Sequence, residues 1–248
     1  MERQVEMTQA AHFFDLAITQ IAGLRDKKSV RVLDFGCGEG GLINALVDRG
    51  YDAIGCDIAL YGDGQTNSRV HKIADAPYRL PCRDESIDIV VSTCVLEHAR
   101  NPHEYMSEIR RVLKPGGHAM HLMPARYYLP TEPHLRVPMA NFFWPNCPTW
   151  WFAMWAILQF RGPYPKYLKW REMVALCRKF YDNEVIYMPT RQYNDLSRQY
   201  FSAHSWPMAF YIKNSYGGFA SLAKLFPLPR LWGYLSREYR MAFLVQRK

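Results

Sequence analysis

The chain has 248 residues, 49% of them apolar, which is enough to bury a core of its own and accommodate one domain with an insertion. This composition excludes a disordered or collagen-like chain. The six cysteines are scattered without a Cys-x-x-Cys pair, which disfavours a zinc cluster or disulfide framework and favours a reducing, cytoplasmic compartment. The first ten residues are polar and do not resemble a signal peptide.

In chain order, residues 1–124 alternate between strand and helix signals. Apolar residues at helical spacing predict helices at 4–22, 41–50 and 101–113, and short apolar runs predict strands at 29–35, 51–57, 68–74, 86–93 and 118–123. We expect residues 114–117, Lys-Pro-Gly-Gly, to end the third helix. Strands that alternate with helices indicate a mainly parallel α/β sheet.

Glycines are concentrated directly after the first predicted strand, at Gly36, Gly38 and Gly40. In parallel α/β sheets ligands bind at the carboxyl ends of the strands, and glycine lets the backbone approach a cofactor closely. Asp57 ends the second strand, where a carboxylate can accept both hydroxyls of a ribose. The glycines alone also fit a dinucleotide, but Asp34 favours the positively charged amino end of S-adenosylmethionine over two phosphates.

Motifs across residues 30–124 resemble those of class I S-adenosylmethionine-dependent methyltransferases, in the small-molecule group that includes the ubiquinone-pathway enzymes. The matching segments are residues 34–40 (DFGCGEG), Asp57, 74–76 (ADA), 80–81 (LP), 87–90 (IDIV), 95–98 (VLEH) and 108–117 (EIRRVLKPGG). The resemblance implies a Rossmann-like fold with a mostly parallel seven-stranded sheet and helices on both faces. It also implies one domain over 1–248, with a cofactor-binding half at 1–124 and, within 125–248, a substrate-binding insertion at about 125–180 and closing strands.

The same resemblance implies a role for each cofactor-binding residue. The methionine part is expected at Asp34 and the turn that holds Gly36, Cys37, Gly38 and Gly40; the ribose at Asp57, beside Ile58; the adenine at Asp75 and Ala76; and the region near the sulfonium at Thr93. Simple packing explains Cys37 and Ile58 equally well.

Some relatives bind Mg²⁺ through a Glu-x-x-Glu-His run after the fourth strand. The corresponding run here, residues 94–98, begins with Cys94 instead of an acid. Because a hard cation prefers oxygen ligands, we expect no metal, and we expect activity to survive EDTA.

An alcohol acceptor would need a base, and the candidates are His98, His121, Glu132 and His134. His98 follows the fourth strand, although it could instead orient the next helix. We expect His98 or His134 to take the proton and Glu132 to orient that histidine.

Residues 127–139 follow the fifth strand, and their prolines prevent a regular helix. The Glu-Pro-His pattern in this loop is similar to loops of methyltransferases from bacterial glycan pathways. We expect Tyr127, Tyr128 and Arg136 to contact the acceptor, with Arg136 binding an anionic group.

Residues 142–160 are very apolar, but the uninterrupted part, 149–160, is too short to span a bilayer. This stretch could be a lid packed on the sheet, a dimer contact, or an interfacial helix with Arg161, Lys166, Lys169 and Arg171 at lipid headgroups. The first interpretation is favoured. Further along, the pattern predicts a helix at 171–180, a strand at 184–188, a helix at 207–226 broken at 217–218, and a closing antiparallel strand at 239–248.

Charge is distributed unevenly between the two halves. Residues 1–124 contain 14 Lys and Arg against 17 Asp and Glu, whereas residues 125–248 contain 17 against 6 together with all seven tryptophans. The basic, aromatic half indicates an anionic partner, although a solvated basic surface explains it equally well. No RNA-binding motif is recognisable, so no nucleic acid is expected.

Together these observations predict a methyltransferase that acts on a sugar hydroxyl in a glycan or a nucleotide- or carrier-linked sugar. The alternatives are a lipid or quinone headgroup at a membrane face, a small amine, and an inactive cofactor-binding partner subunit. We expect a small or carrier-linked anionic acceptor, a monomer or homodimer, and a cytoplasmic protein with or without peripheral contact at the inner membrane face.

Overall fold

The computed structural model describes residues 2–159, 162, 168–216, 218–225 and 228–248, with side chains from Val5 onward. Phe160, Arg161 and Lys166 of the expected interfacial stretch, and Gly217 of the expected helix break, lie outside the described residues.

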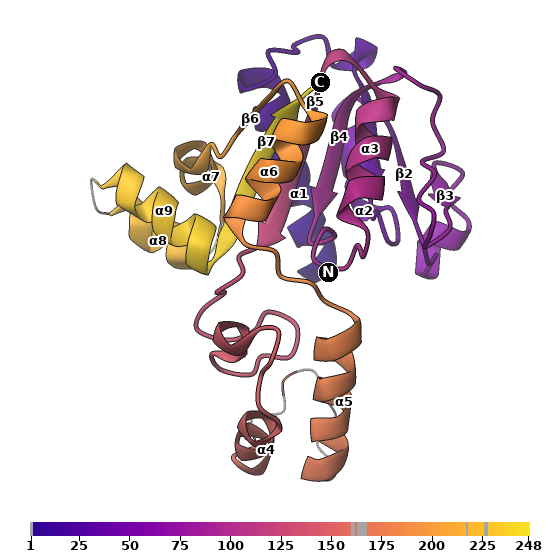
Figure 1. Ribbon diagram of the computed structural model, residues 1–248. Helices are drawn as coiled ribbons and strands as arrows, with labels where there is room; N and C mark the ends of the chain where they lie inside the picture. The colour runs from indigo at the N-terminus through magenta and orange to yellow at the C-terminus, as the bar shows by residue number, and fades with distance from the viewer. Residues whose placement is uncertain (1, 160–161, 163–167, 217, 226–227) are drawn as a thin grey trace.

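A seven-stranded sheet in the order β3-β2-β1-β4-β5-β7-β6 forms the centre of the molecule (Figure 1). Its strands are β1 Arg31–Phe35, β2 Asp52–Asp57, β3 Val70–Lys72, β4 Ile87–Thr93, β5 Leu113–Pro124, β6 Ala203–Ser205 and β7 Met241–Arg247. Strands β1 to β5 pair in parallel, and β7 is antiparallel to both β5 and β6. The expected Rossmann-like fold is confirmed.

Helices cover both faces of this sheet because successive strand residues point to opposite sides. On one face α1, α2 and α7 pack on the side chains of Ile89 and Val91; on the other, α3 and α6 pack on Val90 (Figure 1). The helices are α1 Glu2–Gln20, α2 Gly41–Val47, α3 Pro102–Val112, α4 Thr149–Ile157, α5 Trp170–Asn183, α6 Thr190–Tyr200, α7 Met208–Asn214, α8 Gly218–Lys224 and α9 Pro229–Tyr239. Short 3₁₀ turns lie at η1 Lys27–Ser29, η2 Gly62–Gln65 and η3 Ala140–Phe143.

Two expectations about the strands are corrected. Strand β5 begins at Leu113 directly after α3, so residues 114–117 belong to the strand, where a register shift against β4 absorbs them. Residues 184–188 do not form a strand: the Ile186 N–H donates to the Glu97 carbonyl instead of a sheet neighbour. The remaining edge position is taken by β6, which the sequence did not predict.

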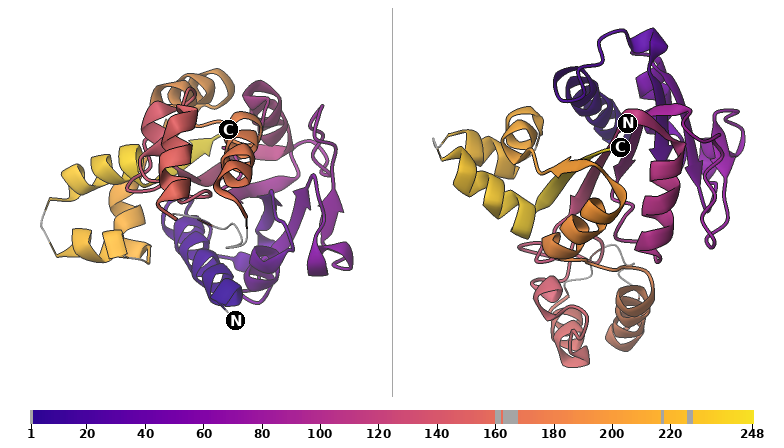
Figure 2. Two further views of the ribbon diagram at one scale, coloured as in Figure 1. Left: turned by 90° about the horizontal axis from the view of Figure 1, so that it is seen from below. Right: turned by 45° about the horizontal axis from the view of Figure 1, so that its top comes forward.

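Helices α4 and α5 lie beyond the carboxyl ends of the parallel strands (Figures 1 and 2). They share an apolar cluster of their own, in which Phe152 of α4 contacts the ring of Tyr181 of α5. The expected lid packed on the sheet is therefore wrong, because other helices already cover both faces of the sheet and α4 packs on α5. Trp150, Ile157 and Leu158 remain exposed. Within the described part of the chain, no helix combines the length and apolarity needed to cross a membrane.

Candidate functional site

The turn between β1 and α2 brings backbone to the carboxyl edge of the sheet. Gly36 and Gly38 have φ angles of +79° and +52°, which favour glycine. A Cβ on Gly36 would lie 2.3 Å from a methyl carbon of Val95, so packing within the protein requires that glycine. Among the described residues other than its chain neighbours, a Cβ on Gly38 would meet no atom within 4 Å, so this position leaves open space above the turn.

Two adjoining cavities, of about 430 and 870 Å³, open beside this turn. They share Gly36, Tyr61 and Thr93. Eight of the ten expected cofactor residues line them, namely Asp34, Gly36, Cys37, Gly38, Asp57, Ile58, Asp75 and Thr93, whereas Gly40 and Ala76 do not. The cavities therefore lie where the sequence places the cofactor.

Asp57 is held in a fixed orientation at the end of β2. Its Oδ2 accepts a hydrogen bond from the Gly38 N–H at 2.8 Å, and its Oδ1 accepts one from the Ala59 N–H at 3.1 Å. The carboxylate thus connects the glycine turn to the next loop, and it lines the smaller cavity, where it can receive the hydroxyls of a ribose.

Asp34 is buried with 3% of its surface exposed, and no other described residue donates a hydrogen bond to its carboxylate. Burial, together with the nearby charge of Asp57, raises the pKa of Asp34 to about 7. The hydroxyl of Thr93, between the two cavities, is also buried without a partner in the described residues. An unpaired acid and an unpaired hydroxyl in one cavity fit a ligand with a cationic end, as S-adenosylmethionine has.

A histidine cluster borders the smaller cavity. The Nε2 atoms of His98 and His134 lie 3.2 Å apart, and only His98 of the two lines the cavity. His98 Nδ1 donates to the Glu184 carbonyl at 2.7 Å. His134 Nδ1 lies 3.0 Å from Glu132 Oε1, and that buried carboxylate also accepts hydrogen bonds from the His134 N–H and the Tyr187 hydroxyl.

Burial and neighbouring charges shift the pKa values of the titratable groups in this cluster. Burial lowers the pKa of His98. Burial also acts to lower the pKa of His134, but the hydrogen bond and charge of Glu132 outweigh it and raise that pKa. Burial raises the pKa of Glu97 to about 7; its nearer oxygen lies 4.0 Å from His134 Nε2.

The other expected site residues lie apart from the two cavities. His121 is fully buried within the sheet, bonded to Ser92 at 2.7 Å, and burial lowers its pKa to about 4, so it is removed from the candidate bases. Tyr127 packs against Phe142 and Tyr239, and the Arg240 guanidinium lies 4.9 Å from the ring of Tyr128. Arg136 is exposed. None of these lines either cavity, so the acceptor roles of both tyrosines and Arg136 stay predictions.

The sequence analysis did not identify several residues that line the cavities. Tyr61 follows β2 and borders both cavities, whereas Asn183 and Glu184 reach the smaller cavity from the end of α5. Tyr61 could have been found as part of the loop after Asp57. The approach of α5 depends on how the insertion folds, which no local pattern encodes.

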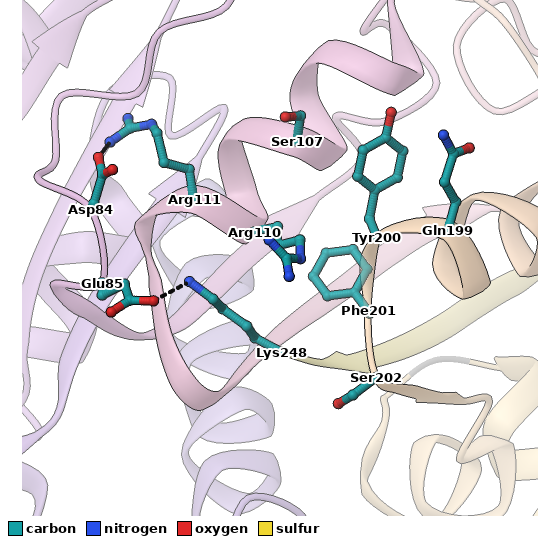
Figure 3. Close-up of a pocket in the computed structure, with 10 residues that line it drawn as sticks. All are labelled: Asp84, Glu85, Ser107, Arg110, Arg111, Gln199, Tyr200, Phe201, Ser202 and Lys248. Atoms are coloured by element: carbon teal, nitrogen blue, oxygen red, sulfur yellow. Dashed lines mark hydrogen bonds and ion pairs between the residues drawn. The ribbon is translucent and has the colours of Figure 1, made fainter.

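A third cavity, of about 890 Å³, lies at the opposite edge of the sheet, where β4 begins and β7 ends (Figure 3). Its charged side chains pair largely with each other: Arg111 turns toward Asp84 and Lys248 toward Glu85. Ligands of open parallel sheets bind at the carboxyl edge, so this groove is not the candidate site despite its size.

Comparison with known proteins shows to which family the chain belongs. A methyltransferase domain family model matches residues 5–206. The ubiquinone biosynthesis O-methyltransferase of Roseobacter denitrificans is 34% identical over 121 residues, 42% of this chain and 48% of that protein. The sterol 4-C-methyltransferase strm-1 of Caenorhabditis elegans is 30% identical over 36% of this chain and 30% of that protein. The chain thus spans half or less of the length of these curated relatives.

Solved structures share the fold along nearly the whole chain. A S-adenosylmethionine-dependent methyltransferase from Mesorhizobium loti superposes with a TM-score of 0.54 at 14% identity, covering 96% of this chain and 98% of that one. The phosphoethanolamine N-methyltransferase 2 of Haemonchus contortus gives 0.53 at 16% identity, covering 95% of this chain and 52% of that one. Since the family model covers most of the chain, the protein belongs to the methyltransferase domain family, with the class I S-adenosylmethionine-dependent methyltransferase fold.

Proposed function

We propose that the protein transfers the methyl group of S-adenosylmethionine to a hydroxyl of a small or carrier-linked acceptor, with a sugar hydroxyl as the first candidate. The observation that carries the proposal is the His98–His134 pair at the wall of the cofactor cavity. An alcohol acceptor has to lose a proton, and a paired histidine beside the reaction site provides a place for it.

Bound S-adenosylmethionine supplies an activated methyl group on its sulfonium. The protein's own residues bind and orient: Asp34 faces the cationic amino end, Asp57 the ribose and Asp75 the adenine. Positioning donor and acceptor in line, with water excluded, accounts for most of what such an enzyme has to provide.

The proton leaves through the histidine pair. His98 keeps its hydrogen on Nδ1, because the Glu184 carbonyl can only accept, so Nε2 is the atom that takes a proton. His134 Nε2 lies 3.2 Å from this atom, and Glu132 offsets the positive charge that the pair acquires.

The experiment is to supply a panel of nucleotide-linked and free sugars with S-adenosylmethionine and to identify methylated products by mass spectrometry. On an accepted substrate, His98→Ala and His134→Ala should each lower kcat by roughly 10²–10⁴, the contribution of a positioned base, with cofactor affinity nearly unchanged. His103→Ala, on the surface of α3, is the matched control and should retain wild-type kcat. Wild-type kcat in both site variants would place the base elsewhere.

A lipid or quinone headgroup is the second candidate acceptor. Several matched relatives are named ubiquinone biosynthesis O-methyltransferases, and Trp150, Ile157 and Leu158 are exposed on the insertion. Methylation of a quinol precursor in the same assay, with no sugar methylated, would select this candidate. Cofactor binding without any methylated product would instead favour an inactive partner subunit.

A further inference from the structure

The donor atoms of Glu97, His98 and His134 converge on one point, next to His98 in the lining of the smaller cavity. One oxygen of Glu97 and one nitrogen from each histidine all lie within 4.8 Å of one another. Two nitrogens bound to one tetrahedral Zn²⁺ lie about 3.3 Å apart, given Zn–N bonds of about 2.0–2.1 Å. The two Nε2 atoms are already 3.2 Å apart.

Both rings are locked so that Nε2 faces this point. The Glu184 carbonyl fixes the Nδ1 hydrogen of His98, and the Glu132 carboxylate binds Nδ1 of His134. Glu132 is itself fixed by the His134 N–H and the Tyr187 hydroxyl. A carbonyl or carboxylate on the far nitrogen of each histidine is the usual second layer of a metal site.

Glu97 provides an independent indication. Its side chain is 2% exposed, and neither of its oxygens has a hydrogen-bond partner among the residues that the structure describes. A buried carboxyl group without a partner costs free energy, so such groups normally pair or bind a metal. Among the described residues, the cationic candidate near Glu97 is His134, whose Nε2 lies 4.0 Å from Glu97 Oε1 and 3.2 Å from His98 Nε2.

We propose that Glu97, His98 and His134 bind one divalent transition-metal ion of the Zn²⁺ class. Two imidazole nitrogens and one carboxylate oxygen suit such an ion, whereas Mg²⁺ prefers oxygen ligands. Three protein ligands leave a coordination position open, as catalytic zinc sites do. The sequence-based expectation of no metal rested on Cys94, but His134, 36 residues beyond His98, completes a different donor set.

A role for the ion in acceptor chemistry rests on the proposed function, whereas its binding does not. In the ion-loaded protein both Nε2 atoms are occupied. Their part in the proposed reaction is then to hold the ion near the acceptor hydroxyl. The ion would lower the pKa of that hydroxyl, so that its proton passes to solvent water rather than to a histidine.

The test is calorimetric titration of the metal-stripped full chain with Zn²⁺ alone, with Co²⁺ absorption as a second readout. Wild type should bind one ion, and His134→Ala and Glu97→Gln should bind at least tenfold more weakly. Glu132→Gln should weaken binding by about 10–100-fold, as expected when the support of a ligand is lost. Cys94→Ser is the matched control and should bind as wild type, without a thiolate band in the Co²⁺ spectrum of either protein.

Two results would overturn the site: no Zn²⁺ or Co²⁺ binding by wild type, or unchanged binding by both His134→Ala and Glu97→Gln. Thermal melting of each variant shows whether it is folded, and His98→Ala replaces Glu97→Gln if the latter is not. S-adenosylmethionine binding and methyl transfer are measured on the same samples. Methyl transfer without metal binding would contradict only the metal site. Metal binding without methyl transfer to any acceptor would contradict only the proposed function.

Discussion

At neutral pH the buried carboxyl group of Asp34 lies close to its own titration point, because burial raises its pKa from 3.8 to about 7. A carboxyl group with a raised pKa stabilises the fold most below its unfolded pKa, and this contribution is lost as the pH rises from 3.8 through 7. Above pH 7 the unliganded protein therefore carries a buried, unpaired charge. A cationic ligand group would remove this cost, which links stability to cofactor binding at a single residue.

Asp34→Asn should accordingly stabilise the unliganded protein while weakening cofactor binding. At pH 8 we expect a gain of at least about 1 kcal/mol, roughly 2–4 °C in Tm, and little change at pH 4. Thermal melting at both pH values measures the first effect. Asp52→Asn, at an exposed ion pair, is the control and should show no such pH-dependent gain.

Calorimetry with S-adenosylmethionine measures the second effect. Wild-type affinity for S-adenosylmethionine should fall as the pH decreases from 7.5 to 5.5, because Asp34, with a pKa of about 7, becomes protonated in this range. Protonated Asp34 no longer attracts the amino group of the cofactor. Asp34→Asn should bind weakly with a flatter pH profile, and Asp57→Ala should also bind weakly. Equal pH profiles for wild type and Asp34→Asn would separate Asp34 from the cofactor.

At the scale of elements, the turn from β1 into α2 combines a packing requirement with an open space. Gly36 and Gly38 share a left-handed backbone, so alanine costs roughly 1–2 kcal/mol at either position. They differ in what a Cβ would meet: Val95 at 2.3 Å in one case, and nothing within 4 Å in the other. One turn thus separates a glycine needed by the fold from a glycine that keeps the cavity open.

These two glycines make a matched pair. Gly36→Ala should lower the Tm of the unliganded protein more than Gly38→Ala does, because only the former displaces Val95. Gly38→Ala should mainly reduce S-adenosylmethionine affinity, since its methyl group enters the space above the turn. Melting curves and calorimetry on both variants decide this, and wild-type cofactor affinity in Gly38→Ala would contradict it.

At the scale of the whole molecule, a nearly neutral cofactor half is joined to a basic half with 17 Lys and Arg against 6 Asp and Glu. The insertion formed by α4 and α5 lies beyond the carboxyl ends of the parallel strands (Figure 1), the edge at which residues such as Asp57 and Thr93 line the two cavities. We infer that this basic half attracts an anionic acceptor, an attraction that salt screens over about 8–10 Å at ordinary ionic strength.

We therefore expect KM for a phosphorylated acceptor to rise with salt, while KM for a neutral acceptor stays constant. Arg136→Ala should raise KM for the phosphorylated acceptor without changing kcat, because it removes binding common to ground and transition states. Lys28→Ala, in η1 at the amino end of the sheet, is the control and should leave both constants unchanged. An unaltered KM in Arg136→Ala would remove this residue from the acceptor site.

The sequence by itself determined the cofactor half. The strand β4, the glycine turn and Asp57 each carry a signal within a few residues: an apolar run, glycines that a side chain would obstruct, and an acid at a strand end. Parallel α/β topology then brings the strand ends to one edge, so local signals were enough to place Asp34 and Asp57 together, and the family resemblance added Thr93. The expected strand at 184–188 was wrong because an apolar run alone does not say which backbone will pair with it.

The sequence predicted His98, Glu132 and His134 as site residues, but only the tertiary structure decided how they meet and which other groups contact them. Glu97 and His98 follow β4, Glu132 and His134 belong to the insertion loop, and the Glu184 carbonyl that fixes His98 is 86 residues away from it. Loop side chains have no periodicity, and their contacts depend on how α4 and α5 pack with each other beyond the sheet. The proposed metal ligands Glu97, His98 and His134 come from two segments, so their arrangement depends on how the insertion folds and not on any one segment.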